Sequence, residues 1–203
     1  MSFVMIIPIG PSGNLLSVER AINELGYKVE YYKKGINLDL VHSAILPGVG
    51  TFSDSMEYLK EDLDFIKSVI KSKPTLGICL GMQLLASIGF EGGTTMGMNI
   101  LNGEVVKVRV NGSLPHIGWT ELKIVRDSKI LNGVDTNERF YFMHSYELIN
   151  YTDFVAVSTY NDHQFVSVVE KDNVFGVQFH PEKSGLSGLK VLKNFLSIGD
   201  LHE

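Results

Sequence analysis

The first half of the chain alternates short apolar runs with amphipathic segments. The apolar runs end at Gly, Pro or Ser clusters, which is typical of buried strands. The amphipathic segments repeat apolar residues mostly every three or four positions, which predicts helices. This alternation indicates a parallel sheet covered by helices. The expected strands span residues 3–10, 27–32, 43–48 and 75–79, and the expected helices span residues 17–26, 52–72 and 81–89.

The second half of the chain has a different pattern, because β-rich segments follow one another with turn residues between them. Only residues 185–199 return to a helical pattern at the end. We therefore expect an α/β fold in which residues 1–203 form a single three-layer domain. Its central sheet should be mixed and mostly parallel, flanked by helices, with the later strands adding an antiparallel part.

Composition narrows the classes of function. The chain has 203 residues and one cysteine, so it has room for one full core and cannot form an internal disulfide. A net charge of −5 and a pI near 5.7 give no electrostatic case for binding nucleic acid or an anionic membrane. No apolar run approaches the roughly 20 residues of a membrane span. These observations lead us to expect a cytoplasmic location.

The one cysteine lies in an informative turn. Gly77-Ile78-Cys79-Leu80-Gly81 places a small residue two positions before and two after the thiol, where a strand should end and a helix begin. This spacing is that of a nucleophile elbow, in which bulky neighbours would clash. The amide of Leu80 would then face a developing oxyanion. A buried cysteine acting as a small hydrophobic residue is the alternative, and the turn alone leaves both open.

A cysteine nucleophile needs a base, and His180 is the best candidate among the six histidines. His180 ends the strand-like segment "VFGVQFH", and Pro181 and Glu182 follow at once. Glu182 could hold the imidazole in one tautomer and stabilise its protonated form. A surface His-Pro-Glu turn with no catalytic role is the alternative.

Three segments occur in order along the chain: "PGVGTF" (47–52), "GICLGMQLL" (77–85) and "GVQFHPEKS" (176–184). Together they resemble the class I, or triad, glutamine amidotransferase family. In that family a cysteine attacks the side-chain amide of L-glutamine, a histidine transfers protons, and a glutamate orients the histidine. The resemblance implies a flavodoxin-like core, no cofactor and no metal. It assigns Cys79 as the nucleophile, His180 as the acid/base and Glu182 as the orienting residue.

The same resemblance implies roles for residues around the thiol. The backbone at Gly48 and Val49 would form the second half of the oxyanion hole, opposite Leu80. Gln83 and the backbone near Ser145 and Tyr146 would contact the α-amino and carboxylate end of the glutamine.

Further segments, "SGNLLSVERAI" (12–22), "PHIGW" (115–119) and "FMHSYE" (142–147), resemble one branch of the family. This branch contains the glutaminase subunits of imidazole glycerol phosphate synthase, which act in histidine biosynthesis. The branch resemblance implies a heterodimer with a (β/α)₈-barrel synthase subunit of the HisF type. That subunit uses the ammonia to form imidazole glycerol phosphate and an aminoimidazole carboxamide ribotide. The residues expected at the interface are Gly13, Asn14, His116 and Trp119.

Two further observations concern the residues expected at the interface. His116 and Trp119 also fit purely structural roles, as a hydrogen-bonded histidine and a packed aromatic residue. The turn at residues 8–14 is one residue longer than is common in the branch, a departure that bears on the partner and the coupling but leaves the triad unchanged. Length supports a separate partner, because the expected elements account for one domain and leave no room for a synthase.

Three alternatives remain open at this stage. A glutaminase of the same branch could supply ammonia to a sugar amidotransferase of surface-polysaccharide synthesis. A non-catalytic binding module on the same scaffold is disfavoured by the intact Cys79, His180 and Glu182. A cysteine hydrolase or chaperone with an elbow is disfavoured by the distant "FHPEKS" segment.

Overall fold

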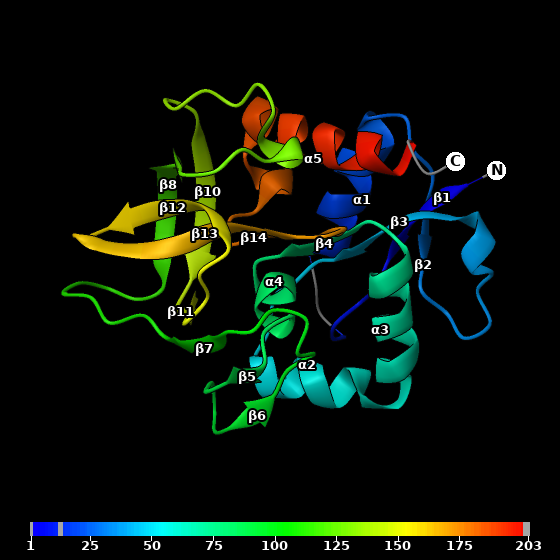
Figure 1. The fold of residues 1–203 in the computed structure, drawn as a ribbon, viewed down its shortest axis with the longest axis horizontal. Helices are drawn as coiled ribbons and strands as arrows, with labels where there is room; N and C mark the ends of the chain where they lie inside the picture. The colour runs from blue at the N-terminus through cyan, green and yellow to red at the C-terminus, as the bar shows by residue number, and fades with distance from the viewer. Residues whose placement is uncertain (1, 12–13, 201–203) are drawn as a thin grey trace.

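The computed structural model describes residues 2–11 and 14–200, and its centre is an eight-stranded mixed sheet (Figure 1). The strands lie in the order β2-β1-β3-β4-β14-β13-β12-β9. Pairing is parallel from β2 to β14 and antiparallel from β14 to β9, as the sequence pattern predicted. The strands are β1 (Phe3–Ile6), β2 (Val29–Tyr31), β3 (Val41–Leu46), β4 (Thr75–Ile78), β9 (Lys123–Ile124), β12 (Phe154–Tyr160), β13 (His163–Lys171) and β14 (Val174–Val177).

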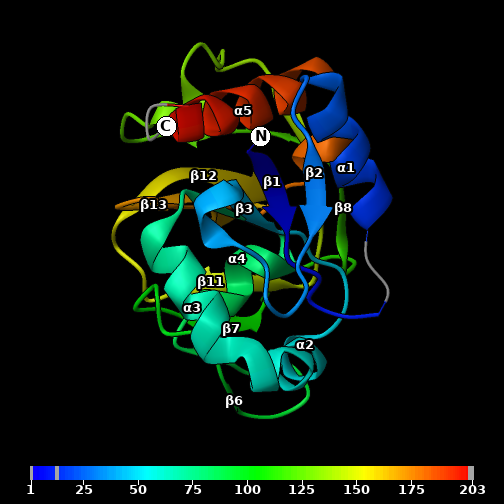
Figure 2. The ribbon, with the colours of Figure 1, turned by 90° about the vertical axis from the view of Figure 1, so that its right-hand side faces the viewer.

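Helices cover both faces of the sheet and give the three layers (Figure 2). Side chains alternate between the faces of each strand, so Val4 and Ile6 of β1 belong to one buried cluster and Phe3 and Met5 to the other. Helices α1 and α5 pack on the first cluster, and α2, α3 and α4 pack on the second. Their bounds are α1 (Leu15–Glu24), α2 (Phe52–Leu59), α3 (Leu63–Ser72), α4 (Leu80–Leu84) and α5 (Gly185–Gly199).

Two smaller sheets lie beside the antiparallel part of the main sheet. One has the order β11-β7-β5-β6, and the other consists of β10 and β8. Ser145 is the single residue between β10 and β11, so one segment joins the two sheets. The strands are β5 (Ile88–Gly89), β6 (Thr95–Met96), β7 (Glu104–Lys107), β8 (His116–Glu121), β10 (Arg139–His144) and β11 (Tyr146–Ile149).

Two expected helices differ from the structure. The helix expected over residues 52–72 is interrupted by a 3₁₀ turn at Lys60–Asp62, and α2 and α3 run in different directions (Figure 1). The apolar spacing continues across this turn because Leu59 and Ile66 are both buried, so the pattern gave no sign of a break. The remaining 3₁₀ turns are Leu38–Leu40, Lys129–Leu131 and Pro181–Lys183.

The helix expected over residues 81–89 ends at Leu84. The returning chain takes the carbonyl groups that a longer helix would use, since Met98 N donates to Leu84 O at 2.8 Å and Ile100 N donates to Leu85 O at 2.9 Å. Ile88–Gly89 instead forms β5. This competition comes from residues distant in sequence, so local periodicity could not reveal it.

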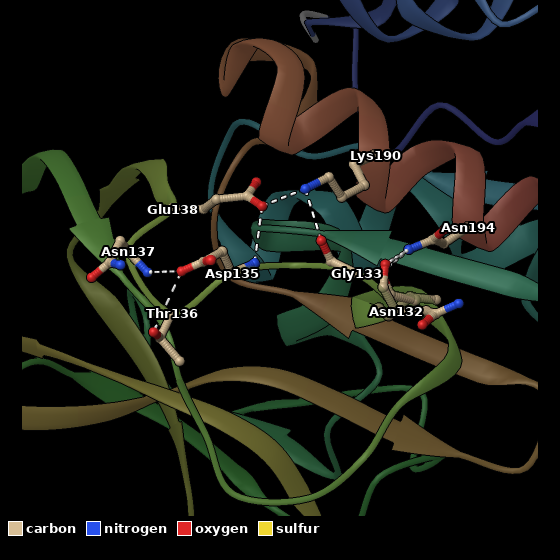
Figure 3. A network of polar contacts seen from close by, with 9 residues as sticks. Asn132, Gly133, Asp135, Thr136, Asn137, Glu138, Lys190 and Asn194 are labelled. Carbon is tan, nitrogen blue, oxygen red and sulfur yellow. Dashed lines mark hydrogen bonds and ion pairs between the residues drawn. The ribbon is translucent and has the colours of Figure 1, made fainter.

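Helix α5 is tied to the loop before β10 by a polar network (Figure 3). Lys190 Nζ donates to Gly133 O at 2.8 Å and forms an ion pair with Glu138. Asn194 Nδ2 donates to Asn132 O at 2.8 Å, one helical turn further on. These contacts hold α5 against the segment that leads into β10.

Among the helices of the described residues, none is long and apolar enough to cross a membrane.

Candidate active site

Cys79 lies between β4 and α4 with φ 52° and ψ −108°, a backbone conformation that a residue with a side chain rarely adopts. The flanking glycines make the turn possible. A Cβ on Gly77 would lie 2.7 Å from Met82 N, and a Cβ on Gly81 would lie 1.8 Å from Leu46 O. The structure thus forms the strained strand-to-helix turn that the glycine spacing predicted.

His180 and Glu182 follow β14, the strand that pairs in parallel with β4. His180 Nδ1 lies 2.8 Å from Glu182 Oε1, and both side chains are 1% exposed. Asn14 Nδ2 donates to the same Glu182 oxygen at 2.6 Å. Among the described residues, His180 Nε2 has no hydrogen-bond partner although it is buried. A buried unpaired nitrogen is costly, and such groups concentrate where chemistry needs them.

The electrostatics of the site favour a protonated His180. Burial acts to lower its pKa, but the Cys79 thiol and Glu182 outweigh burial and raise the pKa of His180 to about 10. The thiol proton points elsewhere in this geometry, because Cys79 Sγ donates to Met143 O at 3.7 Å. His180 interacts with the Cys79 thiol, so the open Nε2 is the group able to take the thiol proton. The arrangement is therefore able to form a thiolate beside an imidazolium.

A cavity of about 200 Å³ opens beside Cys79, whose side chain is buried at its base. It is large enough for a small amino-acid side chain to approach the sulfur. The lining includes every residue that the sequence predicted for the oxyanion hole and the substrate: Gly48, Val49, Leu80, Gln83, Ser145 and Tyr146. The lining also includes Gly50 of the same turn, together with residues for which the sequence predicted no role in the site: Glu91, Pro115, Met143 and His144.

The turn at residues 47–50 contacts the elbow directly. A Cβ on Gly48 would lie 2.6 Å from both Gly81 N and Leu80 Cβ, so only glycine allows this approach. Gly50 has φ 135°, and a Cβ there would meet nothing closer than Leu80 Cδ2 at 3.7 Å. The two glycines thus act differently: the first permits contact, and the second permits an unusual backbone angle.

Gln83 joins the elbow to the far side of the cavity. Its Nε2 donates to Tyr146 O at 2.9 Å and to Gln178 Oε1 at 3.1 Å. Glu91 Oε2 accepts from Phe52 N at 2.8 Å, and burial raises the pKa of Glu91. Gln178 was also missed, although it stands two residues before His180 and its Nε2 lies 3.5 Å from Cys79 Sγ.

The residues expected at a partner interface are placed differently from one another. Trp119 is 51% exposed on β8, as an interface residue would be. His116 is 3% exposed, and its ring nitrogens lie 3.2 Å from His144 Nε2 and 3.2 Å from Thr120 Oγ1. Its position supports the alternative of a structural histidine. Asn14 directs its side chain at Glu182, and Gly13 lies outside the described residues.

Solved structures share this fold. The chain matches a chain in the structure of PurLQS from Thermotoga maritima with a TM-score of 0.73 and 21% identity, covering 98% of this chain and 99% of that one. It matches a glutamine amidotransferase, also from Thermotoga maritima, with a TM-score of 0.69 and 18% identity, covering 98% of each chain. At these identities the likeness concerns the fold, and it confirms the expected α/β architecture.

Sequence relatives are more similar. The chain is 41% identical over 194 residues to the imidazole glycerol phosphate synthase subunit HisH 1 of Campylobacter jejuni strain RM1221, covering 92% of this chain and 96% of the relative. It is 44% identical over 187 residues to subunit HisH of Caldanaerobacter subterraneus, covering 90% and 92%. The family model of class-I glutamine amidotransferases matches residues 12–198. The chain therefore belongs to the class-I glutamine amidotransferase family, as its motifs predicted.

Proposed function

We propose that this chain is the glutaminase subunit of an imidazole glycerol phosphate synthase. It hydrolyses L-glutamine to glutamate and ammonia and passes the ammonia to a synthase subunit. The observation that carries the proposal is the buried His180–Glu182 pair beside Cys79, at a cavity in a chain 41–44% identical to HisH subunits. The resemblance seen in the sequence supports the same function.

The reaction follows from the site. Cys79 gives its proton to His180 Nε2, and the thiolate attacks the side-chain amide carbon of glutamine. The carbonyl oxygen becomes an oxyanion, which the amides at Leu80 and Val49 stabilise. His180 returns the proton to the leaving nitrogen as the C–N bond breaks, giving ammonia and a thioester. His180 then accepts a proton from water, which attacks the thioester and releases glutamate and the thiol.

Glu182 keeps His180 oriented during both proton transfers. It accepts from Nδ1–H, so Nε2 is the nitrogen that exchanges protons with the thiol and with water. Glutamine itself is held at its α-amino and carboxylate end by Gln83 and the backbone of Ser145 and Tyr146. Glu91 adds a carboxylate on the cavity wall, which suits the α-ammonium group.

The ammonia acceptor belongs to another chain, a (β/α)₈-barrel subunit of the HisF type. Trp119 and Ile117 of β8 are 51% and 58% exposed, and such apolar side chains suit a partner surface. Gly13 and Asn14 belong to the same proposed interface. With this partner the products are imidazole glycerol phosphate and an aminoimidazole carboxamide ribotide, and the complex works in the cytoplasm.

The test is a glutamine-dependent synthesis assay. The chain is mixed with the cyclase of an imidazole glycerol phosphate synthase and, in parallel, with the synthase of a sugar amidotransferase. We expect glutamate release coupled to product formation only with the cyclase. Coupling to the sugar enzyme alone would assign the chain to polysaccharide synthesis instead. Absence of glutamate release with either partner would overturn the glutaminase role.

A further inference from the structure

Gln178 is a buried polar residue that the mechanism above does not use. Its side chain is 0% exposed, directly after β14 and next to the thiol. Its Nε2 lies 3.5 Å from Cys79 Sγ, and its Oε1 lies 3.1 Å from Gln83 Nε2. It therefore touches the proposed reacting atom without belonging to the triad.

The neighbours of Gln178 determine which end of its amide faces the sulfur. Tyr146 O is a backbone carbonyl and can only accept, so the Gln83 group that faces it must be the NH₂ group. The same NH₂ group faces Gln178, so Gln178 must turn its oxygen toward Gln83. Its own NH₂ group is then directed at Cys79 Sγ.

Tyr146 O is itself held in place from a second direction. His144 Nδ1 lies 2.9 Å from it and donates, so His144 Nε2 accepts from His116 Nδ1 at 3.2 Å. His116 Nε2 then accepts from Thr120 Oγ1 at 3.2 Å. Every group in this series has one consistent role, with both histidines neutral. The carbonyl that orients Gln83 is therefore anchored by a buried network.

The two polar partners of the sulfur respond differently to its charge. Met143 O accepts the thiol proton. Once that proton has left, this carbonyl oxygen can form no hydrogen bond with the sulfur. Gln178 Nε2–H donates, and a hydrogen bond of this kind becomes stronger when its acceptor is ionised. Gln178 thus favours the thiolate over the thiol.

We propose that Gln178 is a catalytic residue that stabilises the Cys79 thiolate by donating a hydrogen bond, and that Gln83 is the positioning residue that orients its amide. This inference rests on Cys79 being the nucleophile of the proposed glutaminase reaction. It gives Gln83 a second task, which is independent of glutamine binding.

The test measures thiolate formation directly, in the free chain and without glutamine. Iodoacetamide alkylates the single thiol, because the thiolate sulfur bonds to the acetamide carbon and iodide leaves. The rate is followed against pH. The titratable groups around the sulfur are His180, which interacts with it, and His144, Glu91 and Tyr146, which line the same cavity.

Gln178→Met keeps the length of the side chain and removes the donor. We expect the pH of half-maximal alkylation to rise by about one unit, the size expected for one hydrogen bond to a charged group. Glutamine turnover with the synthase should fall roughly ten-fold in kcat at neutral pH. Gln164→Met, at an exposed position on β13, is the matched control and should leave both measurements unchanged.

Gln83→Met keeps Gln178 but removes the group that orients its amide. We expect a smaller rise in the alkylation midpoint, and no further rise when Gln83→Met is added to Gln178→Met. An unchanged midpoint in a folded Gln178→Met variant, or additive shifts in the double variant, would overturn the proposal. If Gln178→Met does not fold, an unchanged midpoint in Gln83→Met overturns it alone. Lack of glutamine turnover by the wild-type chain would instead reject the proposed function.

Discussion

Two glycine-containing turns meet at the candidate site, and they differ in how tightly the second glycine of each is packed. The elbow around Cys79 is closed by backbone contacts, since a Cβ on Gly81 would lie 1.8 Å from Leu46 O. The turn at residues 47–50 has room at its outer end, where a Cβ on Gly50 meets nothing closer than 3.7 Å. We therefore expect the nucleophile to be held rigidly and the proposed oxyanion donor at Val49 to be able to reorient.

Cys79→Ala removes the reacting atom from the rigid turn and leaves the turn itself in place. We expect glutamine-dependent synthesis to fall by about 10⁴-fold or more, as for loss of a nucleophile. Synthesis from added ammonium by the synthase subunit should be unchanged, which serves as the control. Retained glutamine turnover would contradict the assignment of Cys79.

Glu182→Gln tests whether Glu182 supports His180, the proposed base beside the rigid elbow. Glutamine can still accept from His180 Nδ1, but it lacks the negative charge that raises the pKa of His180. We expect kcat to fall by about 10²–10⁴-fold, with some activity remaining. The pH–rate profile should show the pKa of His180 moved downward. A profile that stays in place would show that Glu182 does not act through His180.

Gly50→Ala tests whether the turn at residues 47–50 can reorient. The added methyl group fits, but φ 135° is unfavourable for alanine, so the turn should lose one of its two peptide orientations. We expect the chain to fold normally. Stimulation of glutaminase turnover by a synthase subunit with bound ligand should fall by about 10²–10³-fold, the effect of one missing oxyanion donor.

The wild-type chain is the reference for that measurement. Alone it should hydrolyse glutamine slowly, and the ligand-bound synthase subunit should accelerate it by selecting the competent orientation. If the free chain already turns over glutamine at the stimulated rate, the hypothesis of a movable turn is wrong. The assignment of the triad would not be affected.

Gly81→Ala tests the rigidity of the elbow. The new Cβ collides with the carbonyl of Leu46, and backbone cannot move aside as a flexible side chain can. We expect the free energy of unfolding to fall by about 3 kcal/mol or more, measured by urea denaturation. Gly50→Ala should cost less in the same assay, about 1–2 kcal/mol, because it brings backbone strain at φ 135° without a collision. Similar losses of unfolding free energy in the two variants would show that the two turns do not differ in rigidity.

The buried network behind the cavity predicts a pH dependence of stability. Burial is the main cause that lowers the pKa of His144 to about 4, below its ordinary value of 6.5. The unfolded chain therefore binds more protons at this residue between these pH values, so stability is full above pH 6.5 and is lost as pH falls toward 4. The loss should amount to at most about 3.5 kcal/mol.

His144→Asn removes the part of this effect that comes from His144, since asparagine keeps a donor near the Nδ1 position and does not titrate. Burial also lowers the pKa of His116, which leaves a remainder in the same direction. Its unfolding free energy should depend less on pH between 4 and 6.5. Two other groups act in different ranges. Glu138 has a pKa of about 2, because the Asp135 amide and Lys190 outweigh burial, so its stabilising contribution is lost below pH 4.5. The contribution of His180, with its raised pKa, is lost only toward alkaline pH.

The sequence revealed those parts of the site that depend on local geometry. Gly77 and Gly81 indicated the elbow because a nucleophile elbow requires small residues at this spacing. Glu91 was missed because it lies in a loop and is held by the distant Phe52 N, and Met143 and His144 were missed because they lie on β10, which pairs with the distant strand β8. The same reason explains the fold: residues 185–199 formed the expected helix, while residues 81–89 did not, since the returning chain competes for the carbonyl groups there.

The alternation at the end of β14 has a consequence for how the chain can evolve. Gln178 and His180 face the sulfur, while Phe179 between them packs against Phe140 with ring centroids 4.4 Å apart. Inserting or deleting one residue in β14 or in the segment from its end at Val177 to His180 would displace both polar groups from the sulfur. Changes in the length of this stretch are therefore incompatible with the site in descendants of this chain.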